Sequence, residues 1–144
     1  MMKSISDFVF VFSSFLFFVS CASFGSHHRN EFSTTVSEFH SHLKWKNFGK
    51  LLPIITPKNQ SCFSQGFEPI KEPLMIESIS IANVHWSEDK NQAKVTGMIL
   101  YFIEPDMILK KGTFAEEWTF HDNEWSVQTF LYPFANDSPH IECL

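Results

Sequence analysis

The sequence predicts an α+β fold, in which an N-terminal helix or helix pair packs on a curved antiparallel sheet of about four strands. Two observations predict this fold. Apolar residues first recur at helical spacing, and from residue 74 onward the pattern changes to alternating strand-like runs separated by short polar turns. A chain of 144 residues with 44% hydrophobic and 19% charged residues has the size and composition of one folded domain.

The helical part of the pattern lies in residues 30–52. Apolar side chains at spacings of four, three and four form one face of an amphipathic helix that begins near Asn30, a good N-cap; they are Phe32, Val36, Phe39 and Leu43. A second short helical turn is expected at 47–52, before Pro53. Residues 54–73 contain three prolines and a glycine, and we predict no regular structure there.

The strand part of the pattern follows without long interruptions. We expect strands at 74–86, 93–103, 107–120 and 125–131, because Ile, Val, Thr and aromatic residues alternate there. The turns between them are short and polar, so neighbouring strands should pair in an antiparallel meander. Residues 30–144 are therefore predicted to form a single α+β domain.

Residues 1–20 have the features of a secretory signal peptide. Lys3 gives a positive start, and the uncharged run from Phe8 to Val19 is long enough for a signal but short for a bilayer span, which needs about 20 apolar residues. The alternative to a cleaved signal peptide is an uncleaved hydrophobic anchor. No other stretch of the sequence is long and apolar enough to span a membrane.

The run ends in Phe18-Val19-Ser20-Cys21-Ala22, which resembles the lipobox of bacterial lipoproteins. The resemblance implies that Cys21 carries the lipid and that residues 21–29 are a tether. It implies a place in the bacterial cell envelope, and in the outer membrane if two membranes are present, because Ala22 is not the Asp that retains lipoproteins in the inner one. Ser20-Cys21-Ala22 also fits ordinary signal peptidase, and the alternative is a freely secreted or periplasmic protein.

If Cys21 is lipidated, Cys62 and Cys143 remain. An even pair in an exported chain is a disulfide candidate, with two free thiols as the alternative. No Cys-x-x-Cys motif, phosphate-binding loop or run of metal ligands occurs, so we expect no metal and no cofactor. The net charge of −5 and the scattered lysines lack the basic stripe of a nucleic-acid-binding protein.

Two segments carry a further resemblance: residues 91–97, Asn-Gln-Ala-Lys-Val-Thr-Gly, and residues 112–127, with Glu117-Trp118, a tight turn and Trp125-Ser126-Val127. Over residues 30–131 the chain resembles the nuclear transport factor 2-like (cystatin-like cone) superfamily, especially its small bacterial lipoproteins. This resemblance implies the cone fold. It implies no single function, because the cone serves enzymes, binding modules and dimerisation domains alike.

Glu116 is the one candidate catalytic residue. It alternates with Phe114 and Trp118 on the third strand, and a carboxylate among aromatic residues in the cone's cavity would resemble the acid–base enzymes of the superfamily. The alternative is that Glu116 lies at a rim or is turned outward by a bulge. Tyr101, Phe114 and Trp118 are candidates for lining a ligand pocket.

Three functions are compatible with the sequence. The first is a non-catalytic envelope lipoprotein that binds a small apolar ligand or another envelope protein. The second is an acid–base enzyme of the ketosteroid-isomerase type that uses Glu116. The third is a structural or assembly module, such as a homodimer, which would carry an exposed apolar sheet face.

Overall fold

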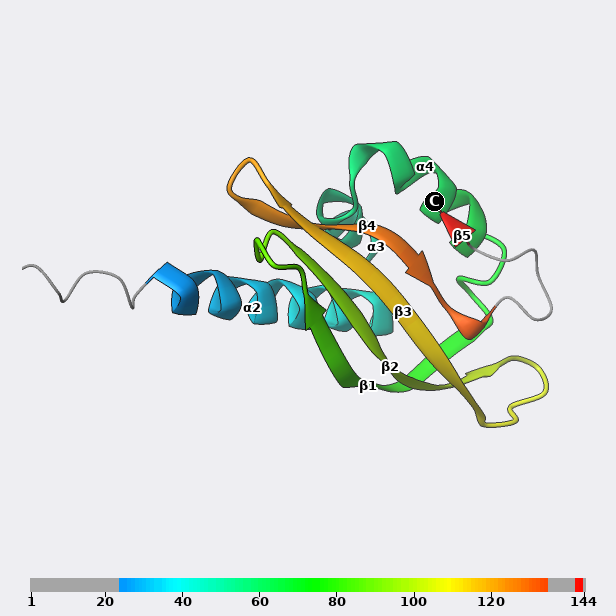
Figure 1. The fold of residues 1–144 in the computed structure, drawn as a ribbon. Helices are drawn as coiled ribbons and strands as arrows, with labels where there is room; N and C mark the ends of the chain where they lie inside the picture. The colour runs from blue at the N-terminus through cyan, green and yellow to red at the C-terminus, as the bar shows by residue number, and fades with distance from the viewer. Residues whose placement is uncertain (1–23, 135–141, 144) are drawn as a thin grey trace, which may run out of the picture. The chain divides into compact units, whose positions relative to one another are not determined.

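The structure is a computed structural model that describes residues 24–134 and 142–143. In chain order its elements are α2 (Phe24–Lys44), α3 (Phe48–Leu51), the 3-10 helix η1 (Leu52–Ile54), α4 (Pro57–Phe67), β1 (Leu74–Trp86), β2 (Gln92–Ile103), β3 (Lys110–His121), β4 (Glu124–Leu131) and β5 (Glu142–Cys143) (Figure 1). Helices come first and an antiparallel sheet follows, so the predicted α+β class is confirmed. The predicted signal peptide and Cys21 lie outside the described residues.

The sheet has the order β1-β2-β3-β4-β5, and every neighbouring pair is antiparallel. The predicted meander of four strands is therefore confirmed, with the two-residue strand β5 added beside the end of β4. Strand β3 begins at Lys110 rather than at residue 107. Met107 has a φ of 50°, in the left-handed region that a strand cannot use, and residues 104–109 therefore form the turn between β2 and β3.

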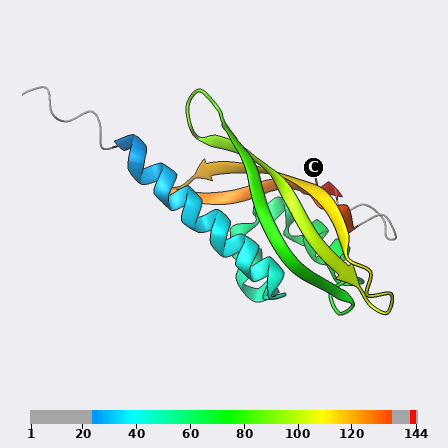
Figure 2. The same cartoon turned by 90° about the horizontal axis from the view of Figure 1, so that it is seen from below.

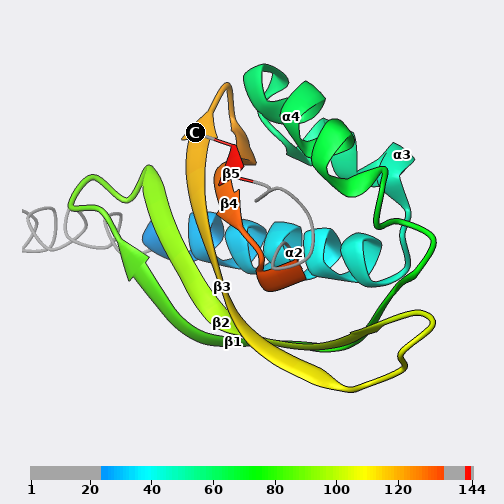
Figure 3. The same ribbon diagram turned by 90° about the vertical axis from the view of Figure 1, so that its right-hand side faces the viewer.

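Alternation along the strands divides the sheet into an inner and an outer face. The inner face is buried and includes Val95, Ile99 and Tyr101 on β2 and Phe114, Glu116 and Trp118 on β3. Register shifts between Ile76 and Ser78 and between Ile81 and Asn83 interrupt β1, and another lies at Glu117/Trp118. Such bulges bend strands, and Figures 2 and 3 show the long strands of the sheet curving.

The described residues divide into two units between Ser33 and Thr34, and the second unit contains the whole sheet. Within the second unit, α2 packs on the inner face of the sheet through the predicted side chains Val36, Phe39 and Leu43, all buried. The Phe39 ring meets the Trp118 ring edge-on, with 5.3 Å between centroids. The helix begins at Phe24, earlier than the expected Asn30. Asn costs well under about 1 kcal/mol inside a helix, so Asn30 is tolerated in the helix interior and does not mark its first residue.

Helix α4 occupies a segment for which we predicted no regular structure. Pro57 stands in its first turn, where a proline needs no N–H donor, and so it starts the helix rather than breaking it. Phe63 and Phe67, one turn apart, stack on each other with centroids 4.5 Å apart, and Phe63 meets Phe130 of β4 edge-on. The Asn59 amide donates to the backbone carbonyl of Gln128, which fixes the start of α4 on β4.

One glycine is required by a close approach. A Cβ on Gly97 would lie 2.2 Å from the carbonyl oxygen of Ser80 and 2.6 Å from the Phe114 ring. Because β2 pairs Gly97 with Phe114 on β3, the missing side chain is the space in which that ring lies. Gly97 thus leaves room for the Phe114 ring, which meets His40 and Tyr132 of the buried core.

Candidate functional site

Glu116 is fully buried on the inner face of β3 and accepts hydrogen bonds from three side chains. Its Oε1 accepts from His40 Nε2 at 2.8 Å and from the Tyr132 hydroxyl, and its Oε2 accepts from Trp118 Nε1 at 2.9 Å. We call these four residues the Glu116 cluster. An ionised carboxylate can only accept, and a buried one requires such donors.

Three separate parts of the chain bring the cluster together. Glu116 and Trp118 point inward because they alternate on β3, His40 comes from α2, and Tyr132 directly follows β4. His40 is only 9% exposed, and its ring meets Phe114 edge-on at 5.2 Å. The cluster therefore ties the N-terminal helix, the centre of the sheet and the C-terminal segment to one carboxylate.

Sequence reasoning singled out Glu116 but missed its partners His40 and Tyr132. Both carried a signal. His40 adjoins the apolar helix position of Phe39, and Tyr132 continues the aromatic alternation of Phe130 and Phe134 past the predicted end of the fourth strand. A buried acid on a neighbouring strand predicts donors of this kind.

The environment of Tyr132 keeps its hydroxyl protonated. Burial raises the pKa of Tyr132 well above its ordinary value, and the charge of Glu116 and the hydrogen bond to it raise that pKa further. The Tyr132 ring stacks on Phe114 and on Phe134, with centroids 5.8 Å and 5.5 Å away. The hydroxyl is therefore a fixed donor to the carboxylate.

The geometry of the cluster suits a structural role better than proton transfer. A general base must lie within hydrogen-bond reach of its substrate. Three donors surround the Glu116 carboxylate, and two hollows formed by described residues, one at the outer face and one beside Trp45, are lined by neither Glu116 nor His40. The carboxylate acts here as the polar centre of the aromatic core.

The candidate pocket residues Tyr101, Phe114 and Trp118 are all buried on the inner face. The Tyr101 hydroxyl donates to the carbonyl oxygen of Pro133 at 3.0 Å, and its ring meets Phe134 edge-on at 4.9 Å. Trp118 alone of the three contributes to one of the two hollows, which lies at the outer face. In the structure these three side chains are neighbours in the packed core.

Cys62 lies on α4 and is disulfide-bonded. Helix α4 contacts β5, the strand that carries Cys143. The pairing of Cys62 with Cys143 stays a prediction, and this contact between their elements is compatible with it. Among the described residues, no group of three or more His, Cys, Asp or Glu side chains is arranged to hold a metal ion.

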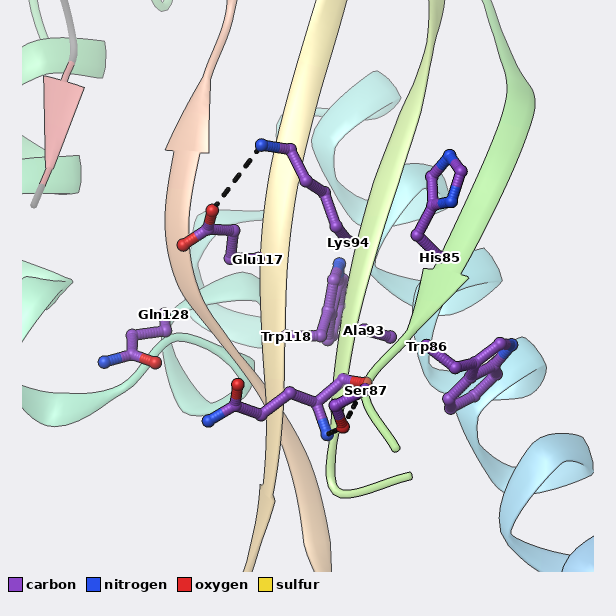
Figure 4. A pocket seen from close by; sticks show the side chains of 9 residues that line it. His85, Trp86, Ser87, Ala93, Lys94, Glu117, Trp118 and Gln128 are labelled. Carbon is purple, nitrogen blue, oxygen red and sulfur yellow. Dashed lines mark hydrogen bonds and ion pairs between the residues drawn. The ribbon is translucent and has the colours of Figure 1, made fainter. Parts of the chain in front are cut away.

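The hollow at the outer face has a volume of about 260 Å³ and a mainly polar lining (Figure 4). A row of paired residues crosses the strands there: His85, Lys94, Glu117 and Thr129. Lys94 Nζ lies 3.7 Å from Glu117 Oε1, and the Thr129 hydroxyl donates to Glu117 Oε2 at 2.9 Å. The Lys94 and Glu117 side chains are each 54% exposed, so water screens their charges.

The other half of the outer face is apolar. The strand registers place its residues side by side: Met75 opposite Phe102, Leu100 and Met98 further along β2, and Ala115 opposite Leu131. We call these six residues the apolar patch. Met75, Met98 and Leu131 are 41%, 40% and 47% exposed. Such a patch on a sheet face marks an interaction site more often than chance.

No protein-family model and no curated protein matches the sequence. Solved structures with a similar fold exist. A SEC-C motif containing protein from Rhodopseudomonas palustris has a TM-score of 0.56 at 7% identity, over 67% of this chain and 73% of that one. A protein from Xanthomonas campestris described as a "putative polyketide cyclase" has a TM-score of 0.54 at 6% identity, over 79% and 98%.

At these identities the likeness shows the fold alone. The similarity to the Xanthomonas protein agrees with the cone fold that the sequence resemblance implied. Within the described part of the chain, no helix is both long and apolar enough to span a bilayer.

Proposed function

We propose that the chain is a bacterial envelope lipoprotein of the small nuclear transport factor 2-like type, anchored through Cys21, and that it is a non-catalytic assembly module. In this proposal two copies pair through the apolar patch. The outer membrane is its expected place if the organism has two membranes. The lipobox-like sequence at Cys21 supports the anchor, and the apolar patch carries the assembly role.

The chemistry of the patch supports a protein partner. Its apolar side chains lie among short hydroxyl-bearing residues, Ser78, Ser80 and Thr113, which leave the apolar side chains accessible. Apolar faces of paired strands pack against another sheet. Four strands about 4.8 Å apart and about 3.3 Å long per residue give the whole outer face an area of roughly 750 Å², of which the apolar patch is about half. Each partner of a standard protein interface buries about 800 Å², so the pairing extends from the apolar patch over the polar half of the face.

Charge supports a second copy as that partner. The chain carries a net charge of −5, so two copies repel each other wherever acidic surfaces meet. On the polar row of the outer face Glu117 is paired with Lys94, and Lys111 adds a positive charge beside Leu100. These pairs reduce the repulsion between two copies that meet through this face.

Sedimentation velocity of the purified full chain in mild detergent tests the pairing. We expect a dimer, and we expect Met98→Lys to give monomers because it places a charge in the centre of the patch. Ile81→Lys is the matched control: Ile81 is 47% exposed but pairs with Gly97 on the inner face. A chain that sediments as a monomer, or a Met98→Lys dimer as stable as the original, would contradict the proposal.

The anchor has its own test. The mass of the mature N-terminus should include acyl chains on Cys21, and a Cys21→Ala variant should lack them. An unmodified N-terminus beginning near Ser23 would contradict the lipoprotein and leave a secreted or periplasmic protein, whose pairing through the apolar patch would still be open to the sedimentation test.

A further inference from the structure

We propose that the end of the sheet formed by the β2–β3 turn docks on an anionic phospholipid surface, independently of the lipid on Cys21. The turn joins two long strands and reaches beyond the end of the sheet (Figures 1 and 3). It presents three consecutive aliphatic side chains to solvent. Met107, Ile108 and Leu109 are 56%, 63% and 58% exposed, which is unusual for residues of this kind in a turn.

Trp45 lies at the same end of the second unit. It follows the last residue of α2, is 75% exposed, and has the Lys44 ammonium 5.8 Å from its ring centroid. Trp45, Met75 and Glu104 line one hollow of about 240 Å³, which places the indole beside the base of the turn. The hollow thus connects the exposed indole with Glu104, the first residue of the turn, and we call the aliphatic turn together with this indole the apolar tip.

Charge is distributed unequally between the two ends of the sheet. Around the apolar tip four lysines, Lys44, Lys46, Lys110 and Lys111, balance four carboxylates, Glu72, Glu77, Glu104 and Asp106. Lys44 and Lys46 donate to backbone carbonyl oxygens, at 2.6 Å and 2.9 Å, and a neutral carbonyl does not neutralise their charge. The hairpins at the opposite end are acidic, with Glu88, Asp89, Asp122 and Glu124 against Lys90. An anionic surface would therefore repel the acidic end and leave the tip as the end that can approach it.

The residue types fit a phospholipid surface. Aliphatic side chains on a convex turn can enter the acyl region, an indole is favoured at the level of the headgroups, and lysine stems lie along apolar surface while their ammonium groups reach phosphates. A turn that projects from the sheet presents its apolar side chains outward, whereas a groove for a peptide would enclose them. The outward-facing aliphatic side chains of the turn therefore point to a lipid layer.

Fluorescence quenching by brominated lipid tests this contact. The full chain would be reconstituted, through its own N-terminal segment, in vesicles of phosphatidylethanolamine and phosphatidylglycerol with brominated acyl chains. The emission of Trp45 is obtained by subtracting the fluorescence of the Trp45→Phe variant from that of the unaltered chain. We expect bromine to quench this emission. We expect Ile108→Asp to weaken insertion of the tip by about tenfold or more, because it removes one apolar anchor and adds a charge.

Two controls sharpen the result. Ile81→Asp changes an exposed apolar residue on the inner face of β1 and should leave the quenching unchanged. Replacing both Lys110 and Lys111 by Ala should weaken it by roughly 25-fold, since each lysine near an anionic surface contributes about fivefold. Equal Trp45 emission in brominated and plain vesicles, or quenching that persists in Ile108→Asp, would overturn the proposal. The mass of the N-terminus and the sedimentation of the chain report separately on the proposed function.

Discussion

Replacing Glu116 distinguishes a structural carboxylate from a catalytic one. In Glu116→Ala, the donors of His40, Trp118 and Tyr132 lose their acceptor inside the core. An unsatisfied buried donor costs about 1–3 kcal/mol. Part of this cost is offset because the variant no longer buries a charge, and His40 can turn toward water. Because these two effects reduce the summed cost of three donors, we expect the free energy of unfolding to fall by about 3–5 kcal/mol.

Urea unfolding followed by circular dichroism measures this change. Glu117→Ala is the matched control, because Glu117 is the next residue on the same strand but lies exposed on the outer face. Its ion pair with Lys94 is a surface pair, so the control should lose no more than about 1 kcal/mol. Enzyme active sites are often strained, and their replacement then costs little or stabilises the fold. Unchanged or increased stability in Glu116→Ala would therefore refute the structural role and favour the acid–base alternative.

Two further predictions concern the same core. Burial and Glu116 raise the folded-state pKa of Tyr132. The stability that its protonated hydroxyl contributes is therefore complete below the ordinary pKa of 10.0 and is lost as the pH rises above that value. Tyr132→Phe should reduce this alkaline loss of stability in unfolding curves measured on either side of pH 10, and an unchanged pH dependence would argue against this role of Tyr132. Cys62→Ser should lower the free energy of unfolding by about 2–5 kcal/mol. If Cys143 is the partner, Cys143→Ser should lower it by the same amount, and the double variant should cost no more than either single variant. Additive costs, or a different disulfide-linked peptide in a non-reducing digest, would exclude the pairing.

The sequence was sufficient for the elements whose pattern is periodic. The helix face of Val36, Phe39 and Leu43 and the alternation of the four long strands are confirmed, because burial on one face imposes a period that can be read directly. Helix α4 was missed because Pro57 and Gly66 indicate breaks when they are read alone. Their positions in the first and last turns of the helix make both compatible with it.

The Glu116 cluster shows the limit of reading one strand at a time. Alternation predicts that Glu116 shares a face with Phe114 and Trp118, as the structure has it. It does not predict which donors satisfy the carboxylate, because His40 is 76 residues away in sequence and meets it only through tertiary packing. The apolar patch has the same origin, since the pairings of Met75 with Phe102 and of Ala115 with Leu131 depend on the register.

Pairing of two copies through the apolar patch is tested most directly by site-specific photocrosslinking of the full chain in the membrane of a bacterial host. A photoreactive amino acid at position 98 lies in the centre of the patch, and the same group at position 81 lies on the inner face. We predict a covalent dimer of the chain from position 98 and none from position 81. No dimer from position 98, or equal yields from both positions, would contradict the proposed assembly.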